Sequence, residues 1–106
     1  MPDDLRVDVW LWRARLFRTR TLATAKAAQG LIRLRRAGEE MRIDKASRTV
    51  RIDDELTFAI GARVVAVRVA ALGERRGPPA EARGLYDLLT ASTVPLAVDK
   101  TGGAPR

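Results

Sequence analysis

The sequence predicts a single α+β domain in which two short helices pack on a small antiparallel sheet and a C-terminal helix closes the structure. Before Gly30, apolar residues recur at the spacing of an amphipathic helix, whereas after it they alternate with polar residues as in a half-buried strand. A length of 106 residues suffices for one modest hydrophobic core. We therefore expect one domain, with no length left for a separate catalytic domain.

The two helices are predicted within the first thirty residues. A helix over residues 8–17 places Trp10 and Leu11 on one apolar arc, so we expect Trp10 in the core rather than stacked on a base. Thr19 is suited to cap a second helix over residues 20–29, which Gly30 would end. The second helix is rich in alanine, which favours close packing against the first.

A small antiparallel sheet is predicted after Gly30. Ile32 and Leu34 alternate with Arg33 and Arg35, which indicates a strand with one buried and one basic, solvated face. A loop is expected over residues 35–40, and Gly61 with its following alanine favours a hairpin turn. The predicted strands span residues 31–35, 41–43, 49–52, 56–60 and 63–71.

A loop and a third helix are predicted after the sheet. Residues 73–79 contain glycine and proline breaks, and residues 80–91 are compatible with a helix that carries Leu85, Leu88 and Leu89 on one side. We expect this helix to cover a second apolar strip on the first helix, formed by Val9, Trp12 and Leu16. Residues 92–106 have little to bury and are predicted to form a mobile tail.

Charge is concentrated at the start of the chain. The formal net charge is +7, and residues 1–36 hold nine basic and three acidic side chains. Arginine accounts for 17 of the 20 cations, and its planar guanidinium suits bidentate phosphate contact. Arg18 and Arg20 lie at the expected turn with no acidic residue nearby in sequence, which favours a role in binding.

Most catalytic and metal-binding chemistry is excluded by composition. The chain has no cysteine and no histidine, which removes thiol nucleophiles, the commonest general base and the commonest metal ligands. The acidic run from Asp53 to Glu55 is interpreted as a solvated turn rather than a metal site. We expect no catalytic residue, no metal and no cofactor.

The order helix, turn, helix, glycine, then a strand with outward arginines resembles the S4-type RNA-binding domain. The residues that carry the resemblance are Arg6-Val7-Asp8 with Leu11, Thr19-Arg20 with Ala23, Gly30-Leu31-Ile32-Arg33-Leu34, Ala46-Ser47-Arg48-Thr49-Val50 and Asp54-Glu55-Leu56-Thr57. The flanking segments Asp8–Trp12, Arg18–Ala23 and Arg75–Tyr86 look like the ribosome-associated fifteen-kilodalton heat-shock branch of that family. The resemblance implies an S4-type domain over residues 5–71 and a loop and helix extension over residues 72–91, followed by the tail.

The resemblance also implies a function. Relatives bind ribosomal RNA on the large subunit, so we expect structured RNA, and above all large-subunit ribosomal RNA, as the partner in ribosome quality control or recycling. We expect a cytoplasmic monomer with no membrane association and no small-molecule substrate. The residues predicted to contact RNA are Arg6, Arg13, Arg15, Arg18, Thr19, Arg20, Lys26 and Arg33.

Two alternatives remain open from the sequence. A DNA-binding helix-turn-helix protein would insert its second helix into the major groove, but here that helix offers only Thr21, Thr24, Lys26 and Gln29 as base readers. An RNA-modifying enzyme would carry such a module beside a catalytic domain. Arg75 and Arg76 precede a Gly-Pro-Pro segment, and the sequence does not decide between an RNA contact and a structural role for them.

Overall fold

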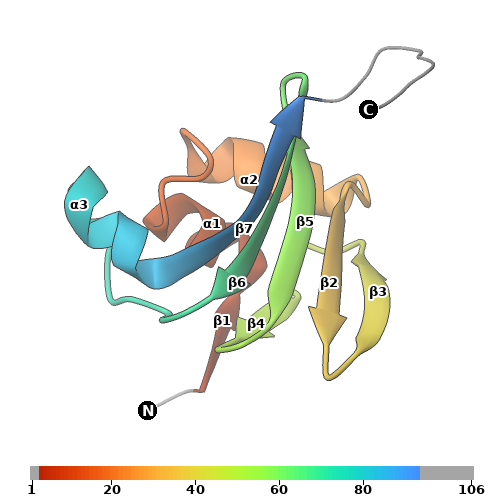
Figure 1. Ribbon diagram of the computed structural model, residues 1–106, viewed down its shortest axis with the longest axis horizontal. Coiled ribbons are helices and arrows are strands. Elements are labelled where there is room, and N and C mark those ends of the chain that lie inside the picture. Colours follow the sequence, from red (N-terminus) through yellow and green to blue (C-terminus); the bar gives the residue numbers. More distant parts are fainter. Residues whose placement is uncertain (1–2, 94–106) are drawn as a thin grey trace.

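The computed structural model describes residues 3–93, in which two helices lie against one face of a five-stranded antiparallel sheet (Figure 1). The five strands follow the order β3-β2-β5-β6-β7, and a second sheet pairs β1 with β4. The predicted α+β class is confirmed. The elements are β1 (Asp4–Arg6), α1 (Val7–Arg13), α2 (Arg20–Ala28), β2 (Ile32–Arg36), β3 (Glu39–Ile43), β4 (Thr49–Arg51), β5 (Glu55–Ile60), β6 (Arg63–Val69), α3 (Pro79–Ala82), the 3-10 turn η1 (Arg83–Leu85) and β7 (Tyr86–Thr93).

The helix pair forms as the local signals predict, although α1 ends earlier than expected. The hydroxyl oxygen of Thr19 accepts a hydrogen bond of 3.1 Å from the backbone N–H of Leu22 and so caps α2. Gly30 follows α2 in the left-handed region, at φ +75°, which glycine adopts at low cost. Arg15 is also left-handed, at φ 60°, so α1 stops at Arg13 rather than continuing to residue 17.

The hairpin formed by β2 and β3 has a shorter turn than the sequence predicts. Ile32 and Leu34 are fully buried between exposed arginines, which confirms the alternation predicted for β2. The loop predicted over residues 35–40 is wrong, since β2 and β3 are joined by a two-residue turn at Ala37 and Gly38. Both turn residues have positive φ, 53° and 82°, the geometry that matches the twist of paired strands.

The C-terminal helix is shorter than predicted. A helix begins at Pro79, close to the expected start, but it ends at Ala82 and a 3-10 turn follows. From Tyr86 to Thr93 the chain is the edge strand β7, antiparallel to β6, rather than a continuation of the helix to residue 91. Leu88 and Leu89 therefore lie on a strand and are 58% and 43% exposed. The rest of the predicted tail, residues 94–106, lies outside the described residues.

The apolar strip of Val9, Trp12 and Leu16 is covered differently from the prediction. The guanidinium of Arg76, from the loop before α3, lies over the Trp12 ring at 5.5 Å from its centroid. This is a cation–π contact, which a positive group and an indole face favour. The predicted packing of Trp12 against a long C-terminal helix is thus wrong, and an arginine side chain takes that place.

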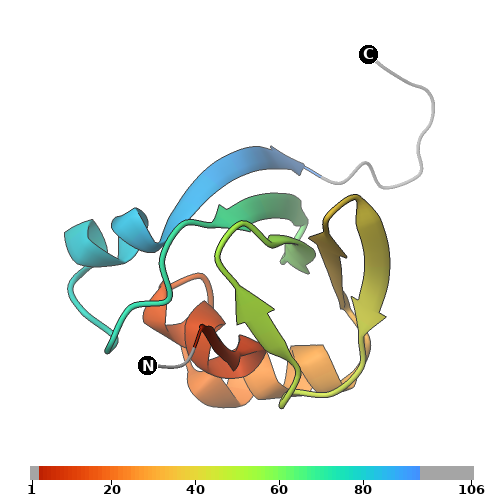
Figure 2. The same cartoon turned by 90° about the horizontal axis from the view of Figure 1, so that it is seen from below.

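The core sits between the helix pair and the sheet, which curves over α1 and α2 (Figure 2). Trp10 is fully buried, as predicted, and its indole N–H donates a 2.9 Å hydrogen bond to the Ala71 carbonyl. Phe17, in the turn between the helices, packs on Phe58 of β5 with ring centroids 5.3 Å apart. The turn that carries the predicted RNA contacts is therefore anchored to the sheet.

No helix within residues 3–93 has the length and apolar character needed to cross a bilayer. The segment after residue 72 is continuous with the rest of the fold, because β7 adds to the sheet beside β6.

Candidate nucleic-acid interface

A buried carboxylate organises the cations at the start of the chain. Asp8 is fully buried, and Arg6 donates to both of its oxygens, Nε to Oδ1 at 3.1 Å and Nη2 to Oδ2 at 3.0 Å. The Thr24 hydroxyl donates to Oδ2 at 2.8 Å, and the Arg20 Nε lies 3.8 Å from the same oxygen. We call Arg6, Asp8, Arg20 and Thr24 the Asp8 cluster. It brings together β1, α1 and α2.

The ionised form of Asp8 is favoured despite burial. Burial raises the pKa of this carboxyl, but hydrogen bonds from Arg6 and Thr24 and the positive charge of Arg6 outweigh it and hold the pKa below its usual value. A buried charge that is paired and hydrogen-bonded in this way fixes the groups around it. Asp8 therefore acts as an internal anchor for Arg6 and Arg20.

The anchored arginines still face solvent. The side chains of Arg6 and Arg20 are 45% and 52% exposed, so they have N–H groups available to an external ligand. Arg18, two residues before Arg20 in the chain, is exposed and makes no side-chain hydrogen bond or ion pair within residues 3–93. Asp8, the acidic residue near Arg20 in the fold, lies twelve residues before it in sequence. The pair is therefore not visible among the sequence neighbours of Arg20.

Two other predicted contacts, Arg13 and Arg15, hold a loop in place. The Arg13 Nη1 donates to the Gly73 carbonyl at 2.8 Å, and the Arg15 Nε donates to the Gly77 carbonyl at 2.6 Å. Both bonds fasten the segment between β6 and α3 against the end of α1. These arginines thus have an intramolecular role besides the RNA contact predicted for them.

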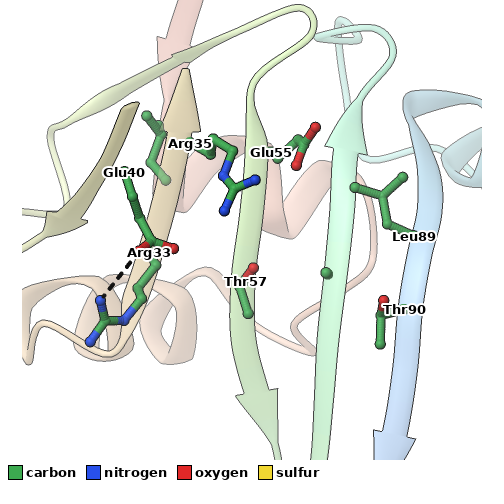
Figure 3. Close-up of a pocket in the computed structure, with 9 residues that line it drawn as sticks. Arg33, Arg35, Glu40, Glu55, Thr57, Leu89 and Thr90 are labelled. Carbon is green, nitrogen blue, oxygen red and sulfur yellow. Dashed lines mark ion pairs between the residues drawn. The ribbon is translucent and has the colours of Figure 1, made fainter. Parts of the chain in front are cut away.

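The remaining predicted residues make no contact with Asp8 and have other surroundings. The hydroxyl oxygen of Thr19 is used as the cap of α2, and Lys26 is half-buried near the other end of that helix. Arg33 lies on the opposite face of the sheet from the helices, 3.9 Å from Glu40. Figure 3 shows this pair at the edge of a hollow of about 190 Å³, which Arg35, Glu55, Thr57 and Thr90 also line. The mixed charge of this hollow makes it a weaker match to a polyanion.

The structure settles the surroundings of two residues, Arg76 and Asp54, that the sequence does not predict. The sequence does not decide the role of Arg76, whereas in the structure its Nη1 donates to the Trp12 carbonyl at 2.6 Å and to the Phe17 carbonyl at 3.3 Å. Asp54 was expected in a solvated turn, but its side chain is only 3% exposed and is paired with Arg36. Within the described residues, no group of acidic side chains is arranged to hold a metal ion.

An exposed helix-turn-helix edge that carries fixed arginines, packed on an antiparallel sheet, defines an S4-type protein. No protein-family model matches the chain. Heat shock protein 15 of Escherichia coli K12 is 34% identical over 84 residues, which is 79% of this chain and 59% of that protein. The homolog in Haemophilus influenzae is 29% identical over 83 residues, or 78% of this chain and 60% of that protein.

The solved structures give the same result. A structure of Vibrio cholerae heat shock protein 15, described as trimeric, superimposes with a TM-score of 0.70 at 28% identity and covers 81% of this chain and 82% of that one. Within the S4-type class, the chain belongs to the heat shock protein 15 family. It spans 59% of the length of the E. coli relative.

Proposed function

We propose that the protein binds structured RNA without catalysing a reaction on it, and that its target is ribosomal RNA of the large subunit. The observation that carries the proposal is the pair of half-exposed arginines at buried Asp8: Arg6 is hydrogen-bonded to it and Arg20 lies within ion-pair distance of it. Arg18, two residues before Arg20, is exposed and is paired with no side chain within residues 3–93. Guanidinium groups at fixed spacing can meet several phosphates at once and release their counterions. The role we propose is in ribosome quality control or recycling in the cytoplasm.

Shape rather than base sequence is the expected basis of recognition. The deep, narrow major groove of A-form RNA hides its base edges, so contacts fall on phosphates and 2′-hydroxyl groups. The exposed face of α2 suits this mode, because Leu22, Ala25 and Ala28 supply no side-chain hydrogen-bonding group there. The Thr24 hydroxyl already donates to Asp8. The same features disfavour the DNA-binding alternative, which needs free polar side chains at base edges.

Sedimentation with ribosomes tests the proposal. Tagged protein is mixed with ribosomes from its own cell and run on sucrose gradients at about 50 and 200 mM salt, a range over which several phosphate contacts lose orders of magnitude in affinity. Comigration with the large subunit that decreases with salt is expected. Protein that stays at the top of the gradient at low salt would refute the ribosomal assignment.

Two further measurements separate the alternatives. In a competition assay, duplex DNA at equal concentration should fail to displace a structured RNA; displacement would favour the helix-turn-helix reading. Mass spectrometry of RNA after incubation with the pure protein should find no modified nucleotide. Sedimentation equilibrium distinguishes the monomer that we expect from the trimer described for the V. cholerae relative.

A further inference from the structure

A second group of arginines surrounds a hollow between the end of α1 and α3. The hollow has a volume of about 360 Å³, and Ala14 and Ala82 form part of its apolar wall. We call it the arginine hollow. Its polar lining is Arg15, Arg76, Arg83 and Tyr86.

Two of these arginines are held rigidly while part of each guanidinium stays available. Arg15 donates only its Nε, to the Gly77 carbonyl, and Arg76 donates only its Nη1, to carbonyls of Trp12 and Phe17. A guanidinium has five N–H groups, so each retains donors that no group in the described chain accepts. Stacking on Trp12 further restricts the Arg76 side chain.

Among residues 3–93, no carboxylate lines the arginine hollow. Glu81, on the same short helix as Ala82, is turned to Arg75, with 2.9 Å between Oε1 and Nη2. Burial and the neighbouring charge of Arg15 both lower the pKa of Arg76, which is the sign of like charges held close together. Three cations without a carboxylate between them give this hollow a positive potential, which favours binding of an anion from outside.

We propose that the arginine hollow binds a phosphate group of the RNA backbone, so that the RNA interface extends from the α1–α2 turn to η1. The inference rests on the proposed function and adds Arg76, Arg83 and Tyr86 to its contacts. Guanidinium forks bind phosphate oxygens in pairs, and the Tyr86 hydroxyl supplies a further donor. Free phosphate offers the same chemistry, and the experiment distinguishes the two sources.

The test compares Arg83→Gln with a matched control, Arg63→Gln. Arg83 is exposed and makes no side-chain hydrogen bond or ion pair within residues 3–93, so its replacement should leave the melting temperature unchanged. Arg63 is equally exposed and begins β6, whereas Tyr86 pairs with Val69 at the other end of that strand. The control thus removes one positive charge at a distance from the hollow.

Two titrations are made on each protein. Inorganic phosphate is added at constant ionic strength, balanced with chloride, while the side-chain Nε–Hε NMR signals of Arg15 and Arg76 are followed. A structured RNA is then titrated at several salt concentrations. We expect phosphate to shift both signals in the wild type and in Arg63→Gln but much less in Arg83→Gln, and the salt slope to fall by about one in Arg83→Gln alone.

The experiment distinguishes failure of the phosphate site from failure of the proposed function. If phosphate moves neither signal, the arginine hollow is not a phosphate site, while RNA binding by the wild type would leave the proposed function intact. Signals that respond to phosphate, with equal RNA affinity and salt slope in both variants, would overturn RNA as the source of the phosphate. A wild type that binds no RNA would refute the proposed function and this inference together.

Discussion

Arg36 of β2 and Asp54, in the turn between β4 and β5, form a two-pronged ion pair in which Nε lies 2.9 Å from Oδ1 and Nη2 lies 2.8 Å from Oδ2. The hydrogen bonds to Asp54 raise the pKa of Arg36 above its ordinary value, so this guanidinium stays charged. Asp54 also accepts the backbone N–H of Arg51 at 2.8 Å. One buried carboxylate thus joins the large sheet to β4.

Removing this carboxylate should be strongly destabilising. Asp54→Asn leaves the Arg36 guanidinium largely buried without its counterion, which costs about 3 kcal/mol of unfolding free energy. Urea denaturation should therefore show a lower midpoint with an unchanged slope. The control is Asp87→Asn, which breaks an exposed pair with Arg68 and should leave the midpoint where it is. Equal midpoints for both variants would contradict the structural role of Asp54.

The Asp8 cluster predicts a specific pH dependence of stability. Because the folded pKa of Asp8 is depressed, its contribution is complete above the unfolded value of 3.8 and is lost as the pH falls through the lower folded value. Asp8→Asn should melt at a lower temperature than the wild type at pH 7. The difference in melting temperature between the variant and the wild type should become smaller below about pH 4. A difference in melting temperature that stays constant down to pH 2.5 would show that Asp8 does not titrate as described.

The α1–α2 edge should account for much of the affinity for RNA. Replacing Arg18 and Arg20 together by alanine is expected to weaken binding by about 1 to 3 kcal/mol and to lower the salt slope by up to about two. Filter binding at several salt concentrations measures both quantities. The matched control replaces Arg51 and Arg63, two exposed arginines outside the predicted contact set, and should bind almost as the wild type does. Comparable losses in the two double variants would indicate a general charge effect.

The loop that carries Arg75 and Arg76 depends on a glycine. Gly73 has φ +76°, and a Cβ added there would lie 3.0 Å from the Cδ1 of Leu85. Gly73→Ala therefore combines backbone strain with overpacking and should cost about 2 kcal/mol of stability, measured by thermal unfolding. Gly84→Ala is the control, since its Cβ would meet nothing within 4 Å. A stable Gly73→Ala variant would show that the loop repacks freely.

Local signals predicted the helix pair and most of the sheet, and distant partners explain what was missed. The Thr19 cap, the Gly30 terminus and the alternation in β2 act over a few residues, so the sequence shows them directly. Leu88 and Leu89 follow Leu85 at a helical spacing, but pairing with β6 makes Tyr86–Thr93 a strand, which no local pattern encodes.

In the candidate site too, contacts between residues that are distant in sequence could not be predicted. That Arg6 and Arg20 share an acid depends on the approach of α2 to α1, and the burial of Asp54 depends on an arginine eighteen residues earlier. The clustering of arginines is visible from sequence alone, and it is the basis for predicting a binding surface. Which of them face a ligand and which fasten a loop could not be recognised in this way.

The packing of Phe17 on Phe58 has a thermodynamic consequence for recognition. The aromatic pair holds the base of Arg18 on the sheet before any ligand arrives, so the turn between α1 and α2 does not have to fold during association. The conformational entropy that this turn loses on binding then comes from its arginine rotamers, which cost about 0.5 to 1.5 kcal/mol for each side chain immobilised. Calorimetry on this α1–α2 edge should accordingly record a small heat-capacity change, unlike the large one that accompanies coupled folding and binding.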